Sequence, residues 1–212
     1  MDPSATVIEG AHWHGDLYPV PVPRGLVIVS DGAGLFGAGD RGAALRQVLR
    51  DYGLSTLAVA PPLRQPVGAA APDSDDAWTI GIDEALAWIE VTSHFEPPAI
   101  GLMGEGIAAA AALRLAGLHA GRISAVVTCN AQIATVIDEL ARVRAATLLI
   151  VAALEPGALE AHREAPTRLR GERRLEVIPG ATRALVEPGA FETMAHLAGT
   201  WLRDHLPSPV RH

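Results

Sequence analysis

The turn Gly104-Glu105-Gly106 lies in the stretch 99–116, AIGLMGEGIAAAAALRLA, and is the part of the chain best shaped for chemistry. The apolar run Ala99–Met103 before it predicts a buried strand, and the alanine-rich run Ile107–Ala116 after it predicts a helix. A strand, a tight glycine turn and a helix form a nucleophile elbow, which holds a reactive side chain above a parallel sheet. Such an elbow needs small residues two positions before and two after the nucleophile, and both positions around residue 106 are small. Because residue 106 is itself glycine, the sequence predicts an elbow without its nucleophile.

Three further side chains near predicted strand ends are candidates for other chemistry. Glu105 is a candidate general acid or base if it faces an apolar cleft, and a plain surface residue if it does not. Asp31 opens a glycine-rich loop, where a carboxylate serves either in proton transfer or in a turn hydrogen bond. Cys129 ends a predicted strand and is either a displaced nucleophile or a buried packing residue.

The elements that must position these residues alternate between strand and helix after an antiparallel hairpin within 5–18. Later strands are predicted at 26–30, 55–60, 99–103, 123–128, 147–151 and 175–178. Helices are predicted at about 40–52, 77–91, 107–116, 131–142, 156–170 and 188–205. This alternation predicts a doubly wound, mostly parallel α/β sheet. Ligands of such sheets gather at the carboxyl ends of the strands, so we expect the site in the loops that follow them.

The composition predicts one soluble globular domain over residues 1–212. The formal net charge is −7 and there is no basic stripe, which argues against a nucleic-acid partner. We see neither a secretory signal nor a run of about 18 apolar residues, so no membrane partner is expected. The single cysteine, Cys129, excludes an internal disulfide and suits the cytoplasm. No histidine–cysteine cluster has metal-site spacing, and we expect neither a metal nor another cofactor.

Motifs along the whole chain resemble the small α/β-hydrolases of the dienelactone hydrolase type. They are Gly-Asp-Leu at 15–17, a glycine loop at 31–34, the elbow at 104–108, LLIV at 148–151 and IPGAT at 178–182. The resemblance implies a single α/β-hydrolase domain over residues 1–212. It also implies a doubly wound, mostly parallel eight-stranded sheet with helices on both faces.

The resemblance implies where the family's catalytic groups would lie, and at those positions this chain differs. The elbow serine or cysteine is here Gly106, and the histidine that returns its proton is here Arg183. The family's acid corresponds to Glu155, and a loop histidine to Asp31. Arginine stays protonated and cannot accept a proton as histidine does, so we expect conventional serine hydrolysis to be absent.

Groups that bind a ligand remain at the positions implied by the resemblance. The backbone N–H groups of Ile107 and of the loop near Ala33 would form a residual oxyanion hole. Two alternatives are open for Glu155 and Arg183: an ion pair in place of the acid–histidine pair, or an anion clamp in which the guanidinium binds a substrate carboxylate. The expected ligand-binding residues are Arg183, Gly106, Ile107, Ala33 and Cys129.

Two functions of different class follow. In the first, the chain is a repurposed small-molecule enzyme of isomerase, lyase or cyclase type, suited to specialised metabolism, with catalytic candidates Glu105, Asp31 and Glu155. In the second, it is a non-catalytic pseudo-hydrolase that binds a ligand or a partner. A third alternative, an esterase with Cys129 as displaced nucleophile, ranks last. The expected ligand is a small organic molecule with a carboxylate or a carbonyl, and a homodimer is left open.

Overall fold

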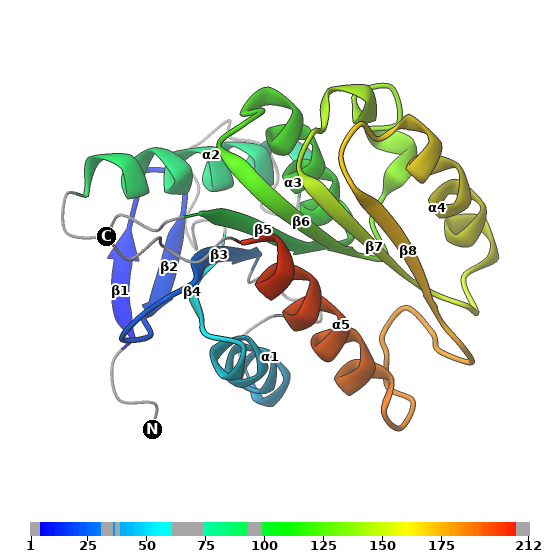
Figure 1. Ribbon diagram of the computed structural model, residues 1–212, viewed down its shortest axis with the longest axis horizontal. Helices are drawn as coiled ribbons and strands as arrows, with labels where there is room; N and C mark the ends of the chain where they lie inside the picture. The colour runs from blue at the N-terminus through cyan, green and yellow to red at the C-terminus, as the bar shows by residue number, and fades with distance from the viewer. Residues whose placement is uncertain (1–4, 31–35, 37–38, 61–73, 93–98, 207–212) are drawn as a thin grey trace.

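Eight strands form one twisted sheet in the computed structural model of the chain (Figure 1). The structure describes residues 5–30, 36, 39–60, 74–92 and 99–206. The strand order is β1-β2-β4-β3-β5-β6-β7-β8; β2 is antiparallel to both neighbours and every other pair is parallel. The strands are β1 Thr6–Glu9, β2 His14–Tyr18, β3 Gly25–Ser30, β4 Leu54–Ala60, β5 Ile100–Glu105, β6 Ile123–Cys129, β7 Ala146–Ala152 and β8 Arg173–Ile178. The predicted eight-stranded, mostly parallel sheet is therefore confirmed.

Helices cover both faces of this sheet. They are α1 Asp40–Asp51, α2 Asp75–Val91, α3 Gly106–Leu118, α4 Pro156–Arg168 and α5 Ala190–His205. Figure 1 shows α2, α3 and α4 above the sheet and α1 with α5 below it. Each layer has its own hydrophobic core against the sheet. Among the described residues, no helix is both long enough and apolar enough to cross a lipid bilayer.

The strand β3 shows why the sequence gives two cores. All six of its residues are buried. Leu26 and Ile28 enter the core under α2 and α3, whereas Val27 and Val29 enter the core under α1 and α5. A continuous apolar run is what a parallel strand covered on both faces requires.

The alanine run of α3 lets this helix lie close to the sheet. The side chains of Ala109, Ala110, Ala111 and Ala112 are all fully buried. A Cβ placed on Gly104 would lie 2.8 Å from the Cα of Ala109, so the glycine is needed for this approach. The amino end of α3 is thereby held directly on the end of β5.

The helix predicted over 131–142 is wrong. The segment instead forms two 3₁₀ turns, Ile133–Thr135 and Leu140–Arg142. Its backbone hydrogen bonds join residues three apart, as in Val136 N–H to Ile133 O at 3.0 Å. The β-branched residues 133 and 135–137 lower helix propensity, while burial of residues 133, 136, 140 and 143 gave the sequence a helix-like spacing.

Candidate functional site

The predicted elbow is present at the carboxyl end of β5, in the middle of the sheet. β5 ends at Glu105 and α3 begins at Gly106, so no residue separates strand from helix. Gly106 has a φ of +57°, in the left-handed region that L side chains rarely adopt. The sharp backbone of a nucleophile elbow is therefore retained, at a residue that adopts it without strain.

The side chain of Arg183 covers this turn. A Cβ placed on Gly106 would lie 2.6 Å from Nη2 of Arg183 and 3.7 Å from its Cζ. The Arg183 side chain is 53% exposed, so the guanidinium is also open to solvent. A cation thus occupies the volume in which the side chain of an elbow nucleophile would begin.

Two carboxylates contact Arg183 in different ways. Oε1 of Glu105 lies 4.0 Å from Nε of Arg183, a long ion pair. Oε1 of Glu155 instead accepts a hydrogen bond of 3.4 Å from the backbone N–H of Arg183. Among the described residues the guanidinium is therefore paired with Glu105, and the ion pair expected between Glu155 and Arg183 is wrong. The side chain extends over the elbow because glycine at position 106 leaves that space open.

Asn130 fixes the backbone around Arg183, and sequence reasoning missed it. It is buried and has a φ of 47°. Its Nδ2 donates to the carbonyl of Arg183 at 3.1 Å, and its Oδ1 accepts from the N–H of Ala152 at 2.9 Å. One side chain therefore ties together the ends of β6 and β7 and the loop that carries Arg183. The available signal was an asparagine directly after a buried strand, since asparagine tolerates the left-handed region.

Cys129 lies beneath the site but is not exposed to it. Its side chain is buried at the end of β6. Burial raises the pKa of the Cys129 thiol far above its ordinary value; the charge of Glu105 raises it further and that of Arg183 opposes this. A thiol held in the neutral form is a poor nucleophile, so this geometry does not favour the Cys129 esterase alternative.

The amino end of α3 adds backbone donors to the site. The first N–H groups of a helix have no partner within the helix, and that of Ile107 is the second in α3. The carbonyl of Gly106 accepts from the N–H of Gln132 at 3.0 Å, which fixes the turn against the segment after β6. Asp31 and Ala33 lie outside the described residues. Within the described part of the chain, no three His, Cys, Asp or Glu residues are grouped as metal ligands.

The described site therefore combines a cation, helix N–H groups and a carboxylate around a turn that lacks a nucleophilic side chain. Arg183 and the amino end of α3 attract an anion or a carbonyl oxygen. Glu105, whose side chain is 16% exposed, supplies a carboxylate next to that position. Glu155 positions the backbone of Arg183.

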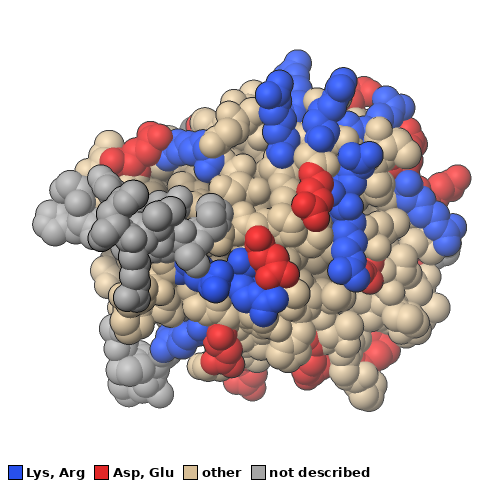
Figure 2. All heavy atoms as spheres, viewed as in Figure 1, with Lys and Arg blue, Asp and Glu red and all other residues tan. Residues whose placement is uncertain are grey.

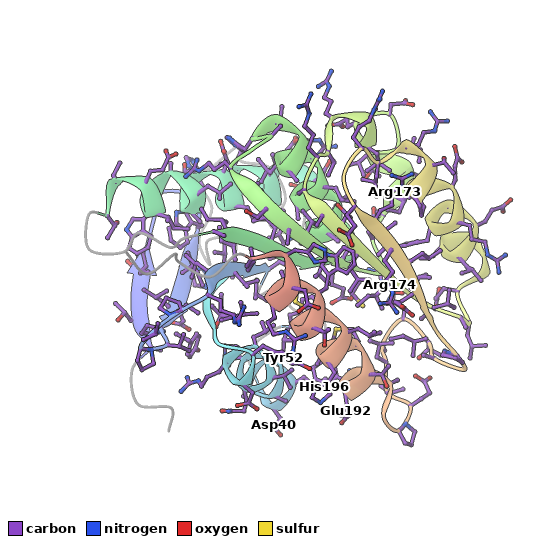
Figure 3. The ribbon with its side chains drawn as sticks, in the orientation of Figure 1. Asp40, Tyr52, Arg173, Arg174, Glu192 and His196 are labelled. Atoms are coloured by element: carbon purple, nitrogen blue, oxygen red, sulfur yellow. The ribbon has the colours of Figure 1, made fainter. Side chains whose placement is uncertain are left out.

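A groove of about 830 Å³ lies elsewhere, between α5 and the strands β7 and β8. Figure 3 shows Arg174 on β8 and Glu192 and His196 on α5, which line it. None of the predicted site residues is part of this lining. The groove is therefore distinct from the elbow.

Comparison with curated proteins gives relatives that are longer than this chain. It is 31% identical over 202 residues to two Mycobacterium tuberculosis proteins, from strains CDC 1551 and H37Rv, both named "Putative phosphoribosyl transferase". The match covers 90% of this chain and 45% of each relative. The chain thus spans about half the length of the curated relatives it matches. No protein-family model matches the chain.

Solved structures with a similar fold include dienelactone hydrolase from Anabaena variabilis. It superposes with a TM-score of 0.83 at 23% identity, over 95% of this chain and 97% of that one. Est1E from Butyrivibrio proteoclasticus with bound ferulic acid gives a TM-score of 0.75 at 14% identity, covering 95% and 99%. An esterase domain from Rhodothermus marinus gives 0.71 at 16% identity, covering 96% and 98%. The chain therefore has the α/β-hydrolase fold, and the predicted resemblance to dienelactone hydrolase is confirmed.

Proposed function

We propose that this α/β-hydrolase-fold protein is a small-molecule enzyme that transfers protons and does not hydrolyse esters by a serine mechanism. The observation that carries the proposal is Arg183 lying over the glycine at the elbow. The substrate would carry a carbonyl or carboxylate group. Its oxygen would lie between the Arg183 guanidinium and the N–H of Ile107.

Binding follows from the charges at the turn. Guanidinium groups bind carboxylates through paired, charge-assisted hydrogen bonds. The amino end of α3 adds a favourable dipole for the same anion. Because Arg183 is half exposed, a ligand reaches it without first opening the core.

Glu105 would supply the acid–base step. Its carboxylate takes a proton from the carbon next to the carbonyl; the C–H electron pair forms a C=C bond, and the C=O π pair moves onto the carbonyl oxygen to give an enolate. Arg183 and the Ile107 N–H stabilise that oxygen as its charge develops. In an unsaturated substrate, return of the proton from Glu105 to the far carbon of the conjugated enolate completes an isomerisation. In a substrate with a leaving group on the β-carbon, the carbonyl re-forms, a C=C bond forms between the α- and β-carbons, and the group departs with its electron pair and takes up the proton from Glu105. Glu155 and Asp31 are further carboxylate candidates.

Two probes test binding and chemistry separately. Benzoate binding by calorimetry should weaken at least about tenfold in R183Q, since a hydrogen bond to a charged group contributes about 1.5–3 kcal/mol. R163Q, which changes an exposed arginine on α4, is the matched control and should leave benzoate affinity unchanged. Benzoate affinity that is equal in R183Q and wild type would overturn the binding role.

Levulinate, which has both a ketone and a carboxylate, reports proton transfer. Its α-protons should exchange in D₂O, followed by NMR, faster with the wild-type protein than with a matched amount of E105Q. E105Q should still bind benzoate, since the guanidinium remains. Equal exchange rates for wild type and E105Q would overturn the acid–base role of Glu105.

A second candidate is a non-catalytic binding module. The observation that favours it is the match to about half of longer proteins, as expected if a fold of this kind serves a larger assembly. Benzoate binding that depends on Arg183, with no exchange of levulinate above the blank, would support this candidate instead.

A further inference from the structure

Arginines gather at the amino ends of β7 and β8, the opposite end of these strands from the elbow. The segments 142–145 and 168–174 have 11 residues, and six of them are arginine. The 212-residue chain has 17 arginines and no lysine. If the arginines were evenly distributed, a stretch of 11 residues would contain only about one of them. The six are Arg142, Arg144, Arg168, Arg170, Arg173 and Arg174.

The fold brings the two segments into contact. The N–H of Arg170 donates to the carbonyl of Val143 at 3.1 Å. A Cβ placed on Gly171 would lie 2.4 Å from the carbonyl oxygen of Arg144, so the two backbones touch. The amino ends of β7 and β8 lie toward the top of the view in Figure 1, and Figure 2 shows blue side chains gathered at the top of the molecule in the same view. The clustering is therefore spatial as well as sequential.

Most of this charge is not neutralised locally. Arg168 pairs with Glu164 at 3.0 Å, and Arg174 pairs with Glu176. The other four arginines have no ion-pair partner among the described residues, and all four are exposed. We call these four the amino-edge arginine patch: Arg142, Arg144, Arg170 and Arg173.

Packing of the fold does not explain the amino-edge arginine patch. Like charges that lie close together repel one another, and exposed side chains of this kind contribute little to the core. A positive cluster on a chain of net charge −7 is therefore suited to an anionic partner.

The neighbourhood of the patch fits a protein rather than a nucleic acid. Leu118, at the end of α3, is 58% exposed. The adjacent Gly117 lies against Arg142, whose Cβ would be 3.1 Å from a Cβ placed there. Arginine beside an exposed apolar side chain is typical of protein interfaces. The large hydrophobic side chains exposed in the described residues include no aromatic one, so stacking platforms for bases are not seen there.

We propose that the amino-edge arginine patch binds an acidic surface of a second protein domain. The length of the mycobacterial relatives fits this class of partner, because 45% of each is matched and the larger share is further protein. Docking at this end leaves the carboxyl ends of the strands, and with them Arg183 and Glu105, open to ligand.

A fluorescent decaglutamate peptide tests the proposal by anisotropy at 50 and 150 mM NaCl. The wild-type chain should bind it, with affinity falling as salt rises. R144Q/R170Q should weaken binding about five- to tenfold, as expected for two exposed charge contacts. The matched control R24Q/R163Q removes two exposed arginines elsewhere and should stay within about twofold of wild type.

Each other outcome overturns the proposal. No decaglutamate binding at 50 mM NaCl, or equal weakening by both double variants, would remove the patch as a docking surface. Patch-dependent binding of a dT10 oligonucleotide as tight as that of decaglutamate would assign the surface to nucleic acid. Patch-dependent self-association in analytical ultracentrifugation would assign it to a second copy of the chain. Circular dichroism confirms that both double variants are folded.

Discussion

Gly106 and Arg183 together decide what a serine at the elbow would do. In Gly106→Ser the new side chain takes a left-handed backbone, which costs an L residue roughly 1–2 kcal/mol. Its Cβ also meets Nη2 of Arg183, the far end of a flexible side chain that can swing aside. We expect G106S to fold with a free energy of unfolding lower by about 1–2 kcal/mol, measured in urea. It should not hydrolyse nitrophenyl acetate, because Arg183 stands where the family has the histidine that takes and returns the serine proton, and arginine stays protonated.

Adding Arg183→His to Gly106→Ser should produce weak ester hydrolysis. The histidine supplies a base and removes the guanidinium from the serine, and Glu155 already lies beside residue 183. Hydrolysis should appear only in the double variant, since such groups act as a unit. G106A/R183H is the control, with the base but no nucleophile. A folded double variant that stays at the control rate would contradict our assignment of positions 106 and 183.

Asn130 should matter for stability and for the site. Asn130→Gly keeps the left-handed backbone but removes the bonds to Arg183 O and Ala152 N, so the free energy of unfolding should fall by about 1–3 kcal/mol. Asn130→Asp keeps the size but lacks the amide donor, and should weaken benzoate binding by loosening the Arg183 loop. R163Q, which changes an exposed arginine on α4, is again the control for benzoate affinity. Equal benzoate affinity in N130D and wild type would show that Asn130 does not position Arg183.

At the scale of elements, α4 contains a buried histidine whose protonation opposes folding. His162 is fully buried, Nδ1 contacts the Ala158 carbonyl at 2.7 Å, and Nε2 has no partner among the described residues. Burial lowers the pKa of His162 below its ordinary value of 6.5. Below about pH 6.5 the unfolded chain therefore binds a proton that the folded chain does not, and stability is lost on acidification.

Urea unfolding at pH 7.5 and 5.5 should show the loss of unfolding free energy that proton uptake by the unfolded chain causes. The wild-type chain should lose up to about 1.4 kcal/mol of unfolding free energy per pH unit through His162. His162→Leu should lose less over the same interval. His196→Gln, which changes an exposed histidine of α5, should keep the wild-type dependence. An unchanged dependence in H162L would mean that His162 is protonated in the folded state.

The elements were predictable wherever local pattern and packing agree. The buried run of β3 and the turn after β5 are both visible in the sequence. The 131–142 segment failed because its buried spacing suggested a helix that its β-branched residues do not support. The direction of the Arg183 side chain was also unpredictable, because it depends on space left by a residue far away in the chain.

At the scale of the whole molecule, the two cores should unfold together. Trp13, Trp78 and Trp88 report on the core under α2 and α3, and Trp201 on the core under α5. Because every central strand contributes to both cores, we expect one urea transition that coincides by circular dichroism and tryptophan fluorescence. Trp201→Phe removes the tryptophan that reports on the core under α5, and its circular dichroism and fluorescence curves should coincide as well. Separate transitions would contradict the single domain predicted over residues 1–212.

The elbow and the amino-edge arginine patch should act independently. The elbow lies at the carboxyl end of β5, whereas the patch lies at the amino ends of β7 and β8. A strand of seven residues such as β7 spans roughly 23 Å, well beyond the Debye length of about 8 Å at physiological salt. Distant sites without shared contacts contribute additively to free energies.

We therefore expect benzoate affinity to change less than about twofold when decaglutamate is saturating, and likewise in R144Q/R170Q. Saturating benzoate should leave decaglutamate affinity equally unchanged, since coupling between two binding sites must be reciprocal. R183Q should do the same, because it changes a residue at the other end of the sheet. Calorimetry with one ligand in the presence of the other measures both directions. A tenfold change in either direction would show that the rigid sheet couples its two ends, and that a docked partner regulates the site. Absence of benzoate binding by the wild-type chain, with decaglutamate binding retained, would instead contradict the proposed site alone, because decaglutamate binding does not depend on Arg183.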